Sequence, residues 1–141
     1  SSVSISLPKN AKALKKAKAA QLSVLLVEDN DINRLYARSI LKNWNCDTDT
    51  AENGLVAIEK IKNQEYDVIL MDIQMPEMDG YAATQWLRSR HYRGPIVALT
   101  AHAMDGYREK CLTAGMDDYL TKPLKAADLA ATVNRWQPVD A

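Results

Sequence analysis

The stretch VILMDIQMPEMDG, residues 68–80, places four apolar residues directly before an aspartate. A short apolar run that is bounded by turn residues predicts a buried strand, and here that strand would end at Asp72. Two explanations of the aspartate are open. Asp72 is either the first solvent-exposed residue after the strand, or a carboxylate held at the sheet edge because a ligand must reach it.

Four further segments have the pattern of strands, and five helical patterns follow the strands in turn. The strands are expected at 23–28, 47–51 (a weaker pattern), 95–100 and 117–121, and the helices at 32–44, 55–63, 81–89, 105–114 and 126–136. Regular alternation of strands and helices predicts an α/β fold with a parallel sheet and right-handed crossovers. The most apolar strands, the first, third and fourth, should be central, and the second should be an edge strand.

The composition indicates one globular domain. The chain has 141 residues, of which 47% are hydrophobic and 26% charged. No run is long enough for a membrane span, and the first residues do not resemble a signal peptide. Cys46 and Cys111 lie far apart and lack metal-ligand spacing, which favours reduced thiols, although a single disulfide stays open.

Charge divides the chain into a basic arm at 1–21, a domain at 22–137 and a tail at 138–141. The arm carries five lysines and no acid, and we expect a solvated linker helix, with contact to an anionic surface as the alternative. The rest has the other 13 Lys and Arg residues against 18 Asp and Glu, a net charge of minus five. That sign argues against nucleic acid as the partner of the domain. Because the chain does not begin with methionine, we expect a piece of a longer protein or a trimmed product.

Polar residues collect where the predicted strands end. Glu28 and Asp29 follow the first strand, Asp72 ends the third, Thr100 ends the fourth, and Lys122 follows the fifth. Ligands of such sheets bind beyond the carboxyl ends of the strands. Three clustered carboxylates repel one another unless a cation joins them, and hard oxygen donors suit Mg²⁺. A carboxylate can also act as the nucleophile that forms an aspartyl phosphate.

Each of these residues also has an ordinary explanation. Asp29 or Asn30 could cap the following helix, Thr100 could be a buried strand threonine, and Lys122 could be a surface lysine. Their shared position at one end of successive strands favours a common site. After the third strand, Asp79 is the predicted cap of the next helix.

Four segments together resemble the receiver domain of response regulators in two-component signalling. They are LLVEDNDINR (25–34), VILMDIQMPEMDG (68–80), IVALTAHA (96–103) and DDYLTKPL (117–124). The resemblance covers residues 22 to about 137 and all five strand–helix units. It implies a flavodoxin-like, doubly wound (βα)5 fold with a five-stranded parallel sheet in the order 2-1-3-4-5.

The resemblance also implies the chemistry of the site. Asp72 matches the phosphoacceptor, and Lys122 matches the lysine that contacts the phosphoryl group. Glu28 and Asp29 match the acidic pair that binds Mg²⁺ (or Mn²⁺) together with Asp72, and the backbone carbonyl of Ile73 is expected as a further ligand. A cis peptide bond between Lys122 and Pro123 is also expected.

Further positions match the parts of a receiver that respond to phosphorylation. Gln74 matches the position that tunes phosphoryl lifetime, Thr100 the switch hydroxyl, and Tyr119 the aromatic that moves with it. The alternative for Tyr119 is a fixed core tyrosine. Ile32 and Leu35, near the site on the first helix, are the candidate docking residues for a partner. Trp136 is expected in the core.

The resemblance predicts a phosphorelay receiver that takes a phosphoryl group from a histidine kinase phosphohistidine and passes it to a histidine phosphotransfer domain. The segments are most like receivers at the carboxyl end of hybrid sensor histidine kinases, which implies a cytoplasmic domain of a membrane-anchored parent. The isolated domain would catalyse only its own phosphorylation and dephosphorylation. A stand-alone response regulator and a non-phosphorylated interaction module are the alternatives.

Two other classes of protein, a phosphohydrolase and a nucleotide-binding fold, fit the residues less well. An Asp-nucleophile phosphohydrolase needs a second aspartate two residues after the first, and that position is Gln74. A nucleotide-binding fold would carry a G-x-G-x-x-G or G-x-x-x-x-G-K-[ST] motif, and the chain contains neither.

Overall fold

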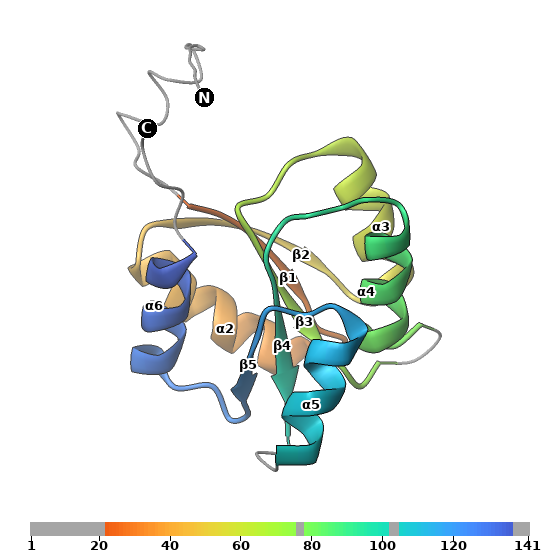
Figure 1. Cartoon of the computed structure of the whole chain (residues 1–141). Helices are drawn as coiled ribbons and strands as arrows, with labels where there is room; N and C mark the ends of the chain where they lie inside the picture. The colour runs from red at the N-terminus through yellow and green to blue at the C-terminus, as the bar shows by residue number, and fades with distance from the viewer. Residues whose placement is uncertain (1–21, 76–77, 102–104, 137–141) are drawn as a thin grey trace.

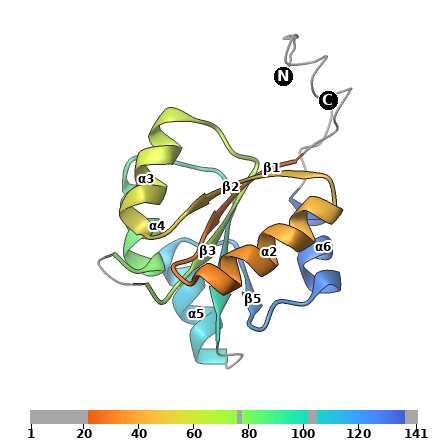
Figure 2. The same ribbon diagram turned by 180° about the vertical axis from the view of Figure 1, so that it is seen from behind.

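A computed structural model describes residues 22–75, 78–101 and 105–136. The predicted arm at 1–21 and the tail at 138–141 lie outside these residues. The described chain is a three-layer α/β fold (Figure 1). Its sheet has the order β2-β1-β3-β4-β5 and all neighbouring strands are parallel. Helices α2 and α6 cover one face, and α3, α4 and α5 cover the other, as the view from behind also shows (Figure 2). The predicted flavodoxin-like order is therefore confirmed.

The elements begin and end within one residue of the predicted positions. The strands are β1 (Leu22–Val27), β2 (Cys46–Ala51), β3 (Val68–Asp72), β4 (Ile96–Thr100) and β5 (Asp118–Thr121). The helices are α2 (Asp31–Asn43), α3 (Gly54–Asn63), α4 (Gly80–Ser89), α5 (Asp105–Ala114) and α6 (Ala126–Arg135). The second strand is an edge strand, as its weaker apolar pattern indicates.

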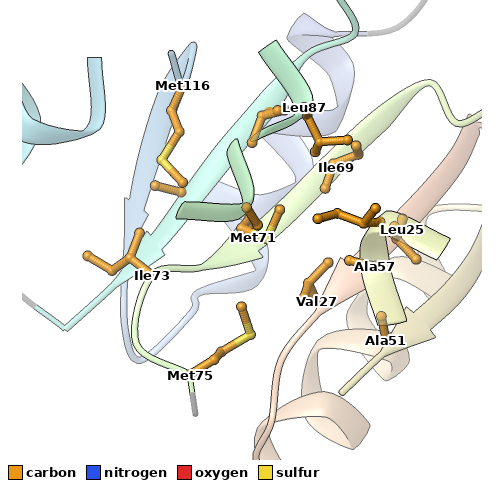
Figure 3. Close-up of a cluster of buried hydrophobic side chains, with 14 of the residues drawn as sticks. Leu25, Val27, Ala51, Ala57, Ile69, Met71, Ile73, Met75, Leu87 and Met116 are labelled. Atoms are coloured by element: carbon orange, nitrogen blue, oxygen red, sulfur yellow. The ribbon is translucent and has the colours of Figure 1, made fainter. Parts of the chain in front are cut away.

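The core consists of two apolar layers, one on each face of the sheet. Residues 68–71 of β3 are fully buried and alternate between the layers: Ile69 and Met71 pack beneath α3, α4 and α5 (Figure 3), and Val68 and Leu70 pack beneath α2 and α6. Burial of each such side chain stabilises the fold by about 1.5–3 kcal/mol relative to exposure. Trp136 is partly buried against the second layer, which agrees with its predicted core position.

Side-chain caps fix the starts of three helices at the carboxyl edge of the sheet. Asn30, Asn53 and Asp79 accept backbone N–H groups of α2, α3 and α4 at 2.8–2.9 Å. Each cap satisfies an N–H that has no partner within its own helix. Asp79 was predicted, and of the two candidates for α2 the cap is Asn30 rather than Asp29. The Asp29 carboxylate is thereby left available for other contacts.

The opposite end of the sheet is tied together by Arg88. Its guanidinium donates to the carbonyls of Tyr92, Gly94 and Gly115 and to the Asp117 carboxylate, each at 2.9 Å. These bonds join the loop after α4 to the loop after α5. These contacts hold the amino ends of β4 and β5 in place. The polar residues described below lie at the opposite, carboxyl ends of the strands.

Two further expectations can be compared with the structure. Cys46 and Cys111 are buried and free, as the reduced-thiol prediction requires. Across 22–75, 78–101 and 105–136, the structure contains no helix with the length and apolar character needed to cross a membrane.

Candidate functional site

Three carboxylates meet at the carboxyl edge of the sheet. One oxygen from each of Glu28, Asp29 and Asp72 lies within 4.8 Å of the others. Glu28 and Asp72 are each 2% exposed, whereas Asp29 is exposed. The explanation of Asp72 as the first solvent-exposed residue after its strand is therefore wrong. Burying two carboxylates costs free energy unless cations or hydrogen bonds compensate them.

Lys122 supplies such compensation. Its Nζ lies 3.0 Å from Asp72 Oδ2 and 3.0 Å from Glu28 Oε1, and its side chain is only 23% exposed. The alternative of an ordinary surface lysine is thus wrong. Three carboxylates and one ammonium leave the cluster with a formal charge of minus two. The predicted cis bond between Lys122 and Pro123 is present.

The pKa values of Glu28 and Lys122 reflect this arrangement. Burial raises the pKa of Glu28, with a further rise from the Asp72 charge, and the hydrogen bond from Lys122 only partly offsets it. Burial acts to lower the pKa of Lys122, but the hydrogen bonds to Glu28 and Asp72 outweigh it, so that this pKa is raised. Lys122 therefore remains an ammonium at neutral pH.

The backbone after β3 holds Asp72 in place. The Gln74 N–H donates to Asp72 Oδ1 at 3.0 Å, and the Gly80 N–H donates to the Ile73 carbonyl at 3.3 Å. A carbonyl oxygen has a second lone pair, so the Ile73 carbonyl as a metal ligand stays a prediction. Gln74 is itself exposed beside Asp72.

Gly80 allows the start of α4 to approach this backbone closely. A Cβ atom at residue 80 would lie 2.4 Å from the Asp72 carbonyl oxygen and 2.7 Å from Ile73 Cα. Both are main-chain atoms, which cannot rotate away as a flexible side chain can. The absence of a side chain at Gly80 is therefore required by the observed path of the loop.

Two contacts that the sequence did not predict hold the turn between β1 and α2. The Asn30 N–H donates to Glu28 Oε2 at 3.1 Å, and Arg34 Nη1 donates to the Glu28 carbonyl at 2.7 Å. Arg34 also pairs with Asp31. The only sequence signal for Arg34 is a basic residue in the first turn of a helix, three positions after an acid.

The two predicted switch residues lie on neighbouring strands. Thr100 ends β4 and is 1% exposed. The register pairs Ala98 with Tyr119 and Thr100 with Thr121. Because side chains alternate between the faces of a sheet, Thr100 and Tyr119 lie on the same face. Tyr119 is partly buried against the apolar layer beneath α5.

The predicted docking residues are exposed on α2. Ile32 is 76% exposed and Leu35 is 70% exposed, and Tyr36 beside them is 51% exposed. Their spacing places these three side chains on one face of the first two turns of the helix. This apolar face begins just after the turn that carries Glu28 and Asp29.

The donor set of the site suits a hard divalent cation. All three side-chain ligands are carboxylates, two are buried, and the exposed Asp29 leaves an approach from solvent. Mg²⁺ prefers such oxygen donors and usually keeps several waters or phosphate oxygens in its coordination shell. The residues present therefore fit the ion that the sequence predicts.

A family model described as the response regulator receiver domain matches residues 24–134, a range that runs from within β1 to within α6. The chain belongs to this family. Receiver domains are components of two-component signalling, and the recognition made from the four sequence segments is confirmed.

Two similar proteins are much longer than this chain. The receiver domain is 46% identical over 124 residues to hybrid signal transduction histidine kinase G of Dictyostelium discoideum, covering 84% of the chain. It is 42% identical over 118 residues to the sensor protein GacS of Pseudomonas syringae pv. syringae, covering 80% of the chain. The matches span only 4% and 13% of these kinases.

A solved structure agrees with both the fold and the family. The receiver domain of the sensor histidine kinase PA1611 from Pseudomonas aeruginosa is 42% identical to this chain, with a TM-score of 0.76. The match covers 82% of this chain and 97% of that one. That crystal structure has a magnesium ion coordinated in its active-site cleft.

Proposed function

We propose that this receiver domain accepts a phosphoryl group from a phosphohistidine onto Asp72, with Mg²⁺ bound by Glu28, Asp29 and Asp72. The observation that carries the proposal is the cluster of three carboxylates whose ligand atoms lie within 4.8 Å of one another, with the partly buried Lys122 ammonium 3.0 Å from two of them. Magnesium in the similar receiver domain from Pseudomonas aeruginosa supports the choice of ion. Mn²⁺ fits the same oxygen donors.

In the transfer step, a carboxylate oxygen of Asp72 attacks phosphorus and the bond from phosphorus to the histidine nitrogen breaks. The electron pair of that bond stays on the imidazole, and Asp72 becomes an acyl phosphate. Bound Mg²⁺ supplies charge neutralisation at the phosphoryl oxygens. The Gln74 N–H holds Oδ1 of Asp72. Oδ2, which accepts from Lys122 at 3.0 Å, would become the nucleophile as Lys122 moves to the phosphoryl group.

Lys122 and Thr100 would contact the new phosphoryl group. Lys122 is a compact positive charge that can move from the Asp72 carboxylate to a phosphoryl oxygen. Thr100 would donate its hydroxyl, and Tyr119 on the neighbouring strand and the same face would shift with it. The added charge of the phosphoryl group would shift the equilibrium between two conformations of these residues. Partners would recognise the change on the face formed by α5, β5 and α6. Gln74 would tune the lifetime of the phosphate.

We also propose that the parent is a hybrid sensor histidine kinase with this domain in the cytoplasm, and that the phosphoryl group passes on to a histidine phosphotransfer domain. The curated relatives support this origin. The domain itself would catalyse only its own phosphorylation and dephosphorylation.

The proposed chemistry is tested by intact mass after incubation with acetyl phosphate, with Mg²⁺ or with chelator, on wild type and Asp72→Asn. We expect one phosphoryl group on wild type with Mg²⁺ and none under the other conditions, because the proposal requires both the Asp72 carboxylate and the metal ion. No adduct on wild type, or an equal adduct on Asp72→Asn, would contradict the assignment. If no adduct is seen, binding of beryllofluoride, a mimic of the phosphoryl group, would indicate that the phosphate is short-lived. Failure to bind it would indicate a domain that is not phosphorylated.

The α2 face formed by Ile32, Leu35 and Tyr36 is the proposed docking surface for the histidine-bearing partner. Ile32→Asp should slow transfer from that partner by at least tenfold, because a charge replaces an apolar contact in a desolvated interface. Labelling by acetyl phosphate should be unchanged. Leu55→Asp on α3 is the matched control, since Leu55 is 50% exposed on a helix that belongs to neither proposed face. Equal transfer by both variants would refute the surface.

A further inference from the structure

Arg34 links the proposed docking helix to the candidate metal site. It lies in the first turn of α2, and its Nη1 donates to the main-chain carbonyl of Glu28 at 2.7 Å. Its other terminal nitrogen pairs with Asp31. The fork geometry of a guanidinium allows both contacts at once. The side chain is 22% exposed, whereas the apolar residues around it on the helix are largely exposed.

The position of this arginine is unfavourable for the helix alone. A cation near a helix N-terminus opposes the helix macrodipole, at a cost of about 0.3–1 kcal/mol, and Asp31 offsets part of it. The hydrogen bond to the Glu28 carbonyl stabilises the conformation in which the side chain folds back over the turn. The main chain of Glu28 is then held at two points, because its N–H donates to the Ala51 carbonyl and its own carbonyl accepts from Arg34. Its carboxylate accepts from the Asn30 N–H and from Lys122.

We propose that Arg34 is a positioning residue for the metal site. The carbonyl of Glu28 belongs to the peptide group that joins Glu28 to Asp29. By fixing that peptide, Arg34 sets the direction in which the Asp29 carboxylate leaves the backbone, toward Glu28 and Asp72. Asp29 is the exposed member of the three carboxylates, and its orientation therefore depends most on the backbone. The inference rests on the proposed role of this site in binding Mg²⁺.

A positioning role and a purely electrostatic role of Arg34 predict opposite changes in Mg²⁺ affinity when the side chain is removed. Loss of a positive charge near a cluster of net charge minus two should strengthen Mg²⁺ binding slightly. Loss of the hydrogen bond that orients a ligand should weaken it, and mutation of such outer contacts typically costs about 10–100-fold in metal affinity. The sign of the change in affinity therefore distinguishes the two roles.

The test is a calorimetric titration with Mg²⁺ alone on wild type, Arg34→Met, Arg34→Lys and Arg38→Met. We expect binding about tenfold weaker in Arg34→Met. Arg34→Lys should also bind more weakly, because lysine keeps the charge but is shorter and lacks the guanidinium fork that contacts Asp31 and the Glu28 carbonyl from two separate nitrogens. Arg38 is exposed one turn further along α2, and Arg38→Met should retain wild-type affinity. Backbone amide shifts of residues 28–30 should change only in the Arg34 variants.

A purely structural role for Arg34 would lower stability in chelator and leave the Mg²⁺ affinity of the folded protein unchanged. That result, or an affinity equal to or above that of Arg38→Met, would overturn the inference. Arg34→Lys keeps the charge and the aliphatic stem and gives a folded variant if Arg34→Met unfolds. If wild type binds no Mg²⁺, the proposed function fails instead, so the two failures can be told apart.

Discussion

Gly80→Ala should lower phosphoryl acceptance from acetyl phosphate about 100-fold and lower the free energy of unfolding by about 2–4 kcal/mol. The added Cβ would lie 2.4 Å from the Asp72 carbonyl oxygen, 2.7 Å from Ile73 Cα and 3.0 Å from the Asp72 carbonyl carbon. Relief of these contacts requires α4 to move away from the end of β3. Such a movement would displace the main chain of Asp72, the proposed phosphoacceptor.

The effect on acceptance should exceed what instability alone causes. The Gly80 N–H is bonded to the Ile73 carbonyl, and the Gln74 N–H is bonded to Asp72 Oδ1. A shift of this loop therefore changes the orientation of the carboxylate even in molecules that stay folded. Urea unfolding gives the stability, and initial rates of labelling at a temperature where both proteins are folded give the acceptance.

Gly106→Ala is the matched control. Residue 106 lies in α5, and a Cβ there would meet nothing within 4 Å. Alanine in a helix is favoured over glycine by about 0.5–1 kcal/mol, so this variant should be slightly more stable and label at the wild-type rate. Normal labelling of Gly80→Ala would show that the loop adapts without moving Asp72.

The fold class and the location of the site follow from regular rules, whereas the strand order 2-1-3-4-5 and the roles of the site residues were implied by the resemblance to receiver domains. Apolar runs of strand length at regular spacing fix the order of elements, and parallel strands bring their carboxyl ends to one edge. Hence the sequence alone predicts that Glu28, Asp29, Asp72 and Lys122 lie together. The boundaries were close because a side chain such as Asp79 caps its helix and signals its start.

The contacts that hold the site could not be predicted in the same way. Whether Lys122 bridges Glu28 and Asp72 depends on distances set by three different strands. The reach of Arg34 back to the Glu28 carbonyl depends on the path of a turn and leaves no periodic signal. The burial of Asp72 was one of two open explanations, because an aspartate after an apolar strand is more often exposed. Such features are products of packing rather than of local pattern.

Lys122→Met should lower the free energy of unfolding in chelator at pH 7 by about 2–4 kcal/mol, and Mg²⁺ should restore much of the loss. Removal of one partner from a buried ion pair typically costs about 3–5 kcal/mol, and the 23% exposure of Lys122 reduces that value through solvent screening. Two buried carboxylates, Glu28 and Asp72, would then face each other without the ammonium. A bound divalent cation replaces the missing charge, so the gain in stability with Mg²⁺ should exceed that of wild type.

The loss of unfolding free energy in Lys122→Met should also become smaller as the pH falls. Burial already raises the pKa of Glu28 above its ordinary value of 4.5, and without Lys122 the rise should be larger. A carboxyl group with a raised pKa in the folded protein favours folding below its unfolded pKa and loses that contribution as the pH rises through its folded pKa. The deficit of Lys122→Met should therefore be largest at neutral pH and decrease toward about pH 5. Lys125→Met, at an exposed lysine three residues on, should match wild type throughout. A deficit independent of both pH and Mg²⁺ would mean that Lys122 contributes by packing and not by its charge.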